Sequence, residues 1–351
     1  MTATASTHTN WIFQSDPGVQ VAGRDVRIDT MRGIAILMVI GIHSLPKPLD
    51  ASWQKMIDAI LRPCVPIFLF ASGYLTAISG RVILWKRIRT ALVPYAIAFA
   101  AAYIYMALHN PAMDHRFTTT VTRFVLAYVF VYYFVLVYVG CTIGLWLIFR
   151  IAENGVPDTR QRLSVLLALS IMFGLIAGSY IDPLLANAGV PDSVIQEVRL
   201  RNIPFWFCFA ALGALIGTTG TDRFLGAMKL AVVCSTLAAY IIYASVRLFD
   251  IGDAADYDSV AFFGYAALFC ALLFVLHLRL PFLAAVGSGS YFIYLSHFFI
   301  ILALRDHASL RAPSVIFDFA IIYAATVIAS VGALLAVRRI VPSGMNHWLG
   351  V

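Results

Sequence analysis

Predominantly apolar stretches as long as a bilayer is thick recur throughout this chain, and those from Leu163 to Tyr180 and from Leu225 to Val246 are clear examples. A helix needs roughly 20 such residues to cross about 30 Å of hydrocarbon. Ten candidate spans can be marked, at residues 31–46, 56–79, 91–108, 126–149, 163–180, 204–219, 225–246, 259–277, 289–304 and 314–337. The sequence therefore predicts an all-α integral membrane protein with about ten transmembrane helices and no soluble domain.

The scarcity of charge supports this prediction. Only 12% of the 351 residues are charged, whereas a typical soluble domain has about 25%. So few charges cannot cover a water-facing surface of this size, and much of the surface must face lipid. The net charge of +7 would suggest nucleic-acid binding in a soluble protein, but no RNA- or DNA-binding motif is present. A positive-inside bias explains the charge instead, and nucleic acid is excluded as a partner.

Lysine and arginine are distributed unevenly between alternate loops, which predicts the orientation. With the N-terminus in the cytoplasm, 14 of the 25 fall inside and nine outside, while Arg32 and Arg62 lie within spans. This excess places both termini in the cytoplasm. We expect a flexible cytoplasmic tail at residues 1–27, which lacks the apolar core of a signal peptide. A transmembrane domain at 28–340 and a cytoplasmic C-terminal tail at 341–351 follow, in a multi-pass protein of the plasma (inner) membrane.

Neither the cysteines nor the acidic residues predict a metal site. The five cysteines lie in apolar segments and form no CxxC pair, so we expect small buried thiols without a disulfide or zinc. One loop is rich in carboxylates, which are ligands that calcium accepts, but solvation explains it better. That loop contains Asp250, Asp253, Asp256 and Asp258.

The first span carries ionisable residues in an otherwise apolar helix. Asp29 can cap the helix N-terminus, and Arg32 lies near the predicted cytoplasmic end. His43 follows eleven residues later, about 16 Å along a helix. Eleven residues is close to three turns, so Arg32 and His43 share one face. A lone histidine is usually a satisfied core residue, but an arginine on the same face favours a functional role.

The second span contains Pro63 and Pro66, which interrupt the helix and require internal partners at membrane depth. Ser72 and Gly73 follow and permit close helix packing. Packing or bonding to its own helix would be sufficient to explain Ser72.

Two later places combine polar groups with apolar surroundings. In the ninth span His297 follows Tyr294, and this histidine is either a hydrogen-bonded structural residue or a functional one. A basic cluster precedes the third span. It is either an ordinary cytoplasmic anchor or a site for a phosphorylated ligand, and it comprises Lys86, Arg87 and Arg89.

At these four places together the chain resembles the acyltransferase-3 family of multispanning membrane acyltransferases. Family members have a first span of the form D-x-x-R-G-x-A with a His eleven residues beyond the Arg, and a second span like P-x-F-F-x-x-S-G. A basic run leading to P-Y and a late G-x-x-S-x-x-x-Y-L-x-H complete the pattern. The matching residues here are Asp29, Arg32-Gly33, Ala35 and His43; Pro66 to Gly73; Lys86 to Tyr95; and Gly287, Ser290, Tyr294, Leu295 and His297.

The resemblance runs from about residue 28 to 340 and has three departures. Lys86 stands where relatives often begin R-x-x-R, and lysine is a point charge instead of a bidentate donor. Leu69 follows Phe68 where two adjacent phenylalanines are common. Many relatives add a hydrolase-like domain after the last span, which is not seen here, so we expect the membrane domain or a partner to recognise the acceptor.

The resemblance implies O-acyl transfer, often of acetyl, to a hydroxyl of a surface polysaccharide or exopolysaccharide, a lipid-linked glycan or an antibiotic sugar. It implies no permanently bound cofactor, with acetyl-CoA or another acyl-CoA as donor substrate. Expected partners are this donor, the glycan or lipid-linked glycan acceptor, the bilayer and polysaccharide assembly proteins. The residues expected to act are His43 and Arg32 in catalysis, Arg32, Lys86, Arg87 and Arg89 in donor binding, and Asp29, Ser72, Tyr294 and His297 in support.

The chemistry of these residues agrees with that expectation. CoA is highly anionic and cytosolic, so its phosphates need cations at the cytoplasmic entrance. Its long arm can carry the thioester about three turns deeper, to His43. An imidazole titrates near neutral pH and suits a general base for an acceptor hydroxyl. A covalent acyl-histidine relay is an alternative, and the sequence does not separate the two.

Two other functions compete with acyl transfer. A transporter or flippase for a polyprenyl-linked sugar would also have about ten spans with intramembrane charge, but no paired broken helices occur in matching halves of the chain. An inactive structural subunit of a polysaccharide export complex would not need an arginine and a histidine on one helix face. Release of CoA from the donor would distinguish an enzyme from a carrier.

Overall fold

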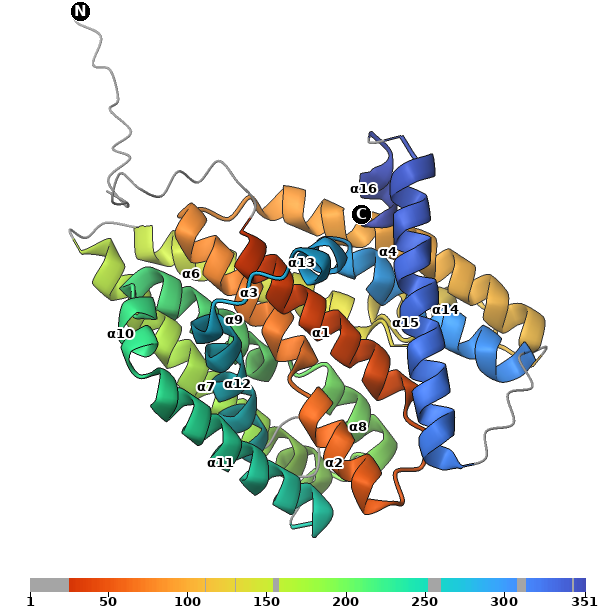
Figure 1. The fold of residues 1–351 in the computed structure, drawn as a ribbon, viewed down its shortest axis with the longest axis horizontal. Coiled ribbons are helices and arrows are strands. Elements are labelled where there is room, and N and C mark those ends of the chain that lie inside the picture. Colours follow the sequence, from red (N-terminus) through yellow and green to blue (C-terminus); the bar gives the residue numbers. More distant parts are fainter. Residues whose placement is uncertain are drawn as a thin grey trace, which may run out of the picture.

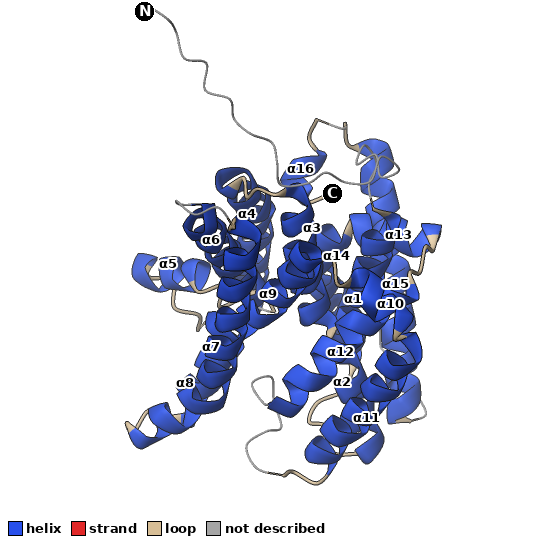
Figure 2. Ribbon diagram, turned by 90° about the vertical axis from the view of Figure 1, so that its left-hand side faces the viewer, coloured by secondary structure: helices blue, strands red, loops and turns tan. Residues whose placement is uncertain are grey.

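The protein, represented by a computed structural model, is built from helices, with no strand among the residues that the structure describes (Figures 1 and 2). Those residues are 25–110, 112–129, 131–153, 158–251, 260–307, 314–342 and 344–351. The helices are α1 (Val26–Ser44), α2 (Ser52–Leu61), α3 (Cys64–Ser79), α4 (Leu84–His109), α5 (Phe117–Val125), α6 (Tyr133–Glu153), α7 (Thr159–Asn187), α8 (Asp192–Leu200), α9 (Ile203–Thr219), α10 (Asp222–Ala227), α11 (Lys229–Leu248), α12 (Val260–Leu276), α13 (Pro281–Ser288), α14 (Ser290–His307), α15 (Val315–Ile340) and α16 (Asn346–Leu349).

Each predicted span coincides with a helix or a pair of helices. Within the described residues, seven stretches are long and apolar enough to cross a membrane, and α13 with α14 makes an eighth if this bent pair is one span. The other two predicted spans are α12, which has only 17 residues, and α1, whose first two turns carry three charges. The prediction of an all-α, multi-pass membrane protein is therefore confirmed.

The start of α1 corrects one prediction. Asp25, not Asp29, caps this helix, because its carboxylate accepts hydrogen bonds from the backbone N–H groups of Arg27 and Ile28. The helix begins at Val26, ahead of the apolar run, so Asp29 lies inside the helix and not at its N-cap. Asp29 is buried in the first turn and pairs with Arg32 instead, with 3.4 Å between Oδ1 and Nη1.

Residues 126–129, 131 and 132 are not helical, although the fourth span was predicted to begin at residue 126. Ala127 has a φ of 49°, which is the left-handed conformation that turns the chain, and α6 begins only after this segment. Its free carbonyls accept side-chain donors: that of Leu126 accepts from Arg201 Nε, and that of Val131 from the Tyr294 hydroxyl. Irregular backbone inside a membrane protein requires such partners.

The second span is interrupted where its prolines predict, because Arg62 and Pro63 form a turn between α2 and α3. Beyond the turn, Gly73 lets α3 approach the backbone of α9. A Cβ at this glycine would lie 1.9 Å from the carbonyl oxygen of Ala210. The predicted close packing at this glycine is therefore present, and α9 is held between α3 and α7.

Backbone contact also joins α1 to α13, and here it is reciprocal. A Cβ at Gly33 would lie 2.1 Å from the carbonyl oxygen of Leu283, and one at Gly287 would lie 1.9 Å from that of Asp29. The chain then bends by 77° between α13 and α14. This bend directs α14 along α1, and the two helices together position the site described below.

The last described residues fold back onto the bundle (Figure 1). The short helix α16 packs against α4, and Gly350 lies against the ring of Tyr291. Parts of two predicted features lie outside the described residues: residues 1–24 of the N-terminal tail, and Asp253, Asp256 and Asp258 of the acidic loop. Within the described part of that loop, Asp250 pairs with Lys55 at 2.9 Å.

Candidate active site

A cavity of about 640 Å³, which we call the basic cavity, brings together most of the residues that the sequence singles out. Side chains from α1, α3, α4, α6 and α14 line it. Four of these side chains are basic, and no acidic side chain occurs among the described residues of the lining. The cavity is therefore suited to an anion. Its polar and charged lining comprises Arg32, Ser72, Ser79, Arg81, Lys86, Arg87, Thr90, Tyr138, Ser288, Ser290, Tyr291 and Tyr294.

Arg32 is held in the basic cavity from two directions. Its Nη1 lies 3.4 Å from the Asp29 carboxylate, and its Nη2 donates a hydrogen bond of 3.1 Å to the Ser290 hydroxyl. Ser290 is buried and is the first residue of α14. The guanidinium group therefore lies beside a helix N-terminus, where the unpaired N–H groups add positive potential.

The basic cluster at the start of α4 divides between two faces of that helix. Lys86 and Arg87 line the basic cavity, and Arg87 also donates a hydrogen bond to the Thr76 hydroxyl. Arg89 is exposed and is not part of the lining, because residues two positions apart point to nearly opposite sides of a helix. Arg81, which the motifs did not single out, lines the cavity in its place.

His43 and His297 lie next to each other, beyond the end of the basic cavity at Tyr294. Their ring centroids are 5.3 Å apart, with the planes inclined at 39°. His297 is fully buried, and its Nδ1 lies 2.8 Å from the carbonyl oxygen of Tyr294 and 3.1 Å from that of Ile293. A carbonyl only accepts, so Nδ1 carries the proton and Nε2 has the free lone pair. This Nε2 has no hydrogen-bond partner among the described residues.

The predicted common face of Arg32 and His43 is confirmed by their neighbours. Arg32 contacts Ser290 and His43 contacts His297, and both partners belong to α14. These partners are seven residues, or about 10 Å, apart along α14. The edge of the Phe298 ring also packs against His43 at a centroid distance of 5.9 Å. One face of α1 therefore leads from the basic cavity to the two imidazoles.

Aromatic side chains lie at the end of the basic cavity, next to the histidine pair. The hydroxyl of Tyr132 donates to the carbonyl of Leu295, and the hydroxyl of Tyr294 donates to the carbonyl of Val131, at 2.7 and 2.6 Å. Phe134 packs edge-on against Tyr294 at 5.5 Å between centroids. All three rings are buried. We call Tyr132, Phe134 and Tyr294 the aromatic layer.

The described residues contain no group of three or more His, Cys, Asp or Glu side chains placed to hold a metal ion. The groups of this site that can act chemically include the two imidazoles, with basic and hydroxyl side chains on one side of them. An imidazole with a free lone pair can accept a proton from a hydroxyl group, and the cations can bind an anionic substrate.

Comparison with protein families gives this arrangement its context. Residues 25–336 match the acyltransferase-3 family model, which describes an acyltransferase domain. The chain belongs to the acyltransferase-3 family. This acyltransferase-3 protein is therefore a multi-pass membrane acyltransferase. No curated protein matches it, and no solved structure does.

Like Arg81, Ser290 and Tyr132 belong to the acyltransferase-3 site but were not chosen from the sequence as site residues. Ser290 is part of the late motif, but only the bend between α13 and α14 shows that it bonds Arg32. Tyr132 lies in a segment predicted to be helical, where nothing distinguishes it from other apolar positions. Tyr132 donates a hydrogen bond to α14, and Tyr294 of α14 donates one back to the neighbouring Val131. Both bonds depend on the irregular backbone before α6.

Proposed function

We propose that this acyltransferase moves an acyl group, in the simplest case acetyl, from acyl-CoA to a glycan hydroxyl. The glycan is a surface polysaccharide or exopolysaccharide, or its lipid-linked precursor. The observation that carries this proposal is a cavity with four cations that ends at Tyr294, with two adjacent imidazoles just beyond it. An anionic donor with a reactive thioester at the end of a long arm matches both parts of this site.

The basic cavity is the proposed site of the donor. Phosphate groups bind well to guanidinium and ammonium groups and to helix N-termini. Arg32, Lys86 and Arg87 provide such cations, and Ser290 begins α14 beside them. The pantetheine arm would then extend past the aromatic layer towards His43, about 16 Å from Arg32 along α1.

The proposed reaction is direct transfer with His43 as the general base. The acceptor hydroxyl oxygen attacks the thioester carbonyl carbon while its proton passes to a ring nitrogen of His43. The carbon–sulfur bond then breaks, and the protonated imidazole returns the proton to the departing CoA sulfur. His297 is the proposed positioning residue, because its Nε2 can accept a hydrogen bond from the other ring N–H of His43.

The proposed location is the plasma (inner) membrane, with both termini in the cytoplasm. This orientation is supported by the excess of lysine and arginine in the segments assigned to the cytoplasmic side. In this orientation the basic cavity opens towards cytosolic CoA, because Arg32, Lys86 and Arg87 lie at the ends of helices that face the cytoplasm. His43 then lies nearer the outer face, where a growing surface glycan is accessible.

A donor-turnover assay tests the proposed function and separates it from transport. Purified protein in lipid nanodiscs, supplied with acetyl-CoA and glycan-containing membrane extract from the producing cells, should release free CoA thiol. Surface glycans of cells lacking the protein should lose an acyl mass. If acetyl-, propionyl- and succinyl-CoA all stay intact while a polyprenyl-linked sugar crosses liposomes containing the protein, the transporter would be the correct function.

Replacing Arg32 with lysine should raise the apparent KM for acyl-CoA about tenfold. An ammonium group cannot keep both the Asp29 and Ser290 contacts while binding a phosphate. Loss of one charge-assisted hydrogen bond costs about 1.5–3 kcal/mol. Steady-state kinetics with varied donor checks this. The matched control is Arg150→Lys, at an exposed position at the end of α6. If Arg32→Lys changed only the KM for the acceptor, the donor assignment would be wrong.

A further inference from the structure

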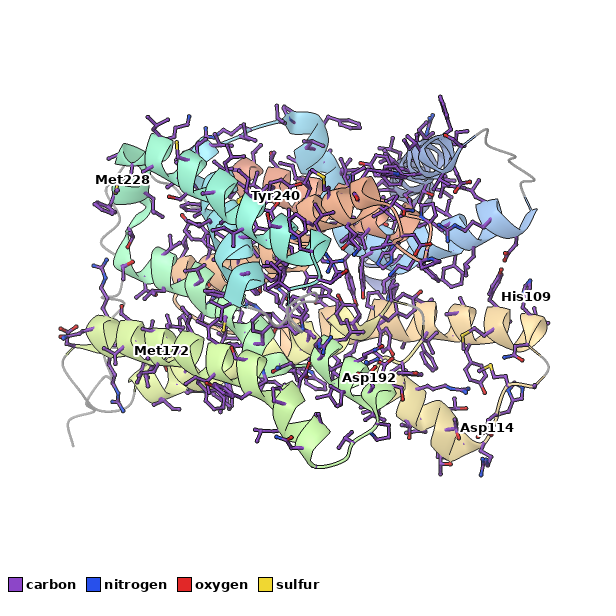
Figure 3. All side chains as sticks on the ribbon, turned by 90° about the horizontal axis from the view of Figure 1, so that it is seen from below. His109, Asp114, Met172, Asp192, Met228 and Tyr240 are labelled. Atoms are coloured by element: carbon purple, nitrogen blue, oxygen red, sulfur yellow. The ribbon has the colours of Figure 1, made fainter. Side chains whose placement is uncertain are left out.

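A second cavity, of about 820 Å³, lies at the opposite end of α4 and α14 from the basic cavity. We call it the far cavity. On α4, Lys86 and Arg87 line the basic cavity, whereas Tyr105 and His109 line the far cavity, and about 30 Å of helix separates the two pairs. Figure 3 shows His109 and Asp114 at the same end of the molecule. The proposed donor site does not use this cavity.

The histidine pair lies between the two cavities. On α14, Tyr294 lines the basic cavity and Leu302 lines the far cavity, with His297 between them in the helix. At the start of α6, Tyr133 lines the far cavity and its neighbour Phe134 lines the basic cavity. The same parts of α14 and α6 therefore form the wall between the cavities. A substrate in the far cavity would therefore lie on the opposite side of this wall from a donor in the basic cavity.

The lining of the far cavity combines aromatic rings with hydrogen-bonding groups. Tyr105, Tyr128 and Tyr133 contribute rings. The guanidinium of Arg201 lies 5.3 Å from the Tyr128 ring centroid and also bonds Glu197. A few directed polar groups on an otherwise apolar and aromatic wall are typical of small-molecule sites. Sugar rings fit this combination, because their C–H faces are apolar and their edges carry hydroxyl groups.

The far cavity differs from the basic cavity in its charge. Its two arginines, Arg123 and Arg201, are balanced by the carboxylates of Asp114 and Glu197. A backbone N–H and the guanidinium of Arg116 hold the pKa of Asp114 well below its usual range, so this carboxylate is ionised at neutral pH. The balance suits an uncharged ligand better than CoA.

The helix α5 beside the far cavity has its apolar side facing outward. Phe117, Val121 and Val125 are 81%, 40% and 58% exposed and lie four residues apart along one stripe. The inner side carries Arg123, which lines the cavity. A water-facing helix has the opposite arrangement. An outward apolar stripe indicates contact with lipid, so this wall of the cavity borders the bilayer.

We propose that the far cavity binds the acceptor and that the acceptor is an uncharged sugar unit of a lipid-anchored glycan. The inference rests on the proposed function. A glycan tethered to a lipid diffuses in the plane where α5 contacts the bilayer, and its sugar enters the cavity beside Tyr128 and Tyr105. Its hydroxyl group then meets His43 from the far side of the wall, while the thioester arrives from the basic cavity.

Blocking the far cavity chemically tests this proposal. Asn110→Cys places a single thiol in its lining, in a protein whose five native cysteines are replaced. The matched control is Ala188→Cys, at an exposed position in the turn between α7 and α8 that is not part of the lining. Both variants are placed in nanodiscs with radiolabelled acetyl-CoA and the organic-solvent lipid extract of the producing cells. Each is assayed before and after reaction with a polyethylene glycol maleimide.

Label should enter the organic phase, and modification of Cys at position 110 should reduce this transfer about 10²-fold, because an excluded acceptor cannot be oriented. The KM for acetyl-CoA should not change on modification, and the control should keep its activity when modified. Tyr128→Cys provides a second test position at the exposed rim. Equal transfer before and after modification at both positions overturns the assignment of the cavity. Label found only in water-soluble polymer overturns the lipid-anchored acceptor, whereas no CoA release from unmodified protein contradicts the proposed function instead.

Discussion

Replacing His43 with alanine should reduce acyl transfer by roughly 10²–10⁴-fold, which is the usual contribution of a general acid–base residue. His43 is partly buried, contacts His297 and Phe298 through its ring, and lies on the helix face that leads from Arg32. The change removes an imidazole and leaves the backbone contact of Gly33 with α13 intact. The loss should therefore appear in kcat at saturating donor, and membrane insertion should be normal.

The control for this experiment is Ser44→Ala, at the next residue. Ser44 is buried, and its hydroxyl bonds the carbonyl of Ile40 within its own helix, so its replacement should keep activity near wild type. Monodisperse purification of both variants would show that insertion and folding are unaffected. Near-wild-type transfer by His43→Ala would rule out the proposed base and would favour another proton acceptor at the wall between the cavities.

Replacing His297 with phenylalanine should reduce kcat about 10–10²-fold and leave the KM for acyl-CoA unchanged. In metal sites, removing the residue that hydrogen-bonds and orients a ligating histidine typically reduces activity or metal affinity about 10–100-fold. The phenylalanine ring fills the same buried space but cannot accept a hydrogen bond from His43. His297→Gln offers an acceptor again and should recover part of the activity. Equal loss in both variants would indicate a packing role instead.

The control for His297 is Ser296→Ala. Ser296 precedes the histidine in α14, and its hydroxyl bonds back to the carbonyl of Phe292. It should retain wild-type kinetics if the effect at His297 is specific. The measurement is a full steady-state analysis with donor and acceptor varied separately. A change in the donor KM of His297→Phe would place this residue in the donor site and contradict the proposed role.

The spans and the common face of Arg32 and His43 were predictable because they depend on local periodicity. An apolar stretch identifies a membrane helix without knowledge of its neighbours. Eleven residues of helix fix the relative direction of two side chains wherever the helix lies. Each property is carried by a single segment. The observed helices confirm the spans, and the contacts of Arg32 and His43 with α14 confirm the common face.

The features that could not be predicted depend on partners far apart in the sequence. Arg32 and Ser290 are separated by 258 positions, and their bond depends on the bend between α13 and α14. The non-helical segment before α6 looks like a normal apolar span, because hydropathy does not register that Tyr294 and Arg201 bond its carbonyls. Arg89 was placed with the donor site by its motif, but helix rotation turns it outward.

The far cavity gave no signal in the sequence for a similar reason. Its lining comes from the end of α4, the segment around α5, the start of α6, the end of α8 with the turn that follows it, and α14. Each contributes one to a few ordinary residues that form no motif on their own. Phe117, Val121 and Val125 recur at a spacing of four, but this segment was left between two predicted spans, and only the structure shows that the stripe faces outward.

The aromatic layer has a consequence for the energy supply of the cell. A membrane protein with water-filled hollows on both sides risks conducting protons, and each charge that crosses 100 mV dissipates about 2.3 kcal/mol. Here the layer contains only uncharged rings, and its two tyrosine hydroxyl groups are fixed to carbonyls of the facing segment. In the proposed function the donor and the acceptor reach the imidazoles from opposite sides of this layer, and we expect its fixed, uncharged groups to slow the passage of protons between the two cavities.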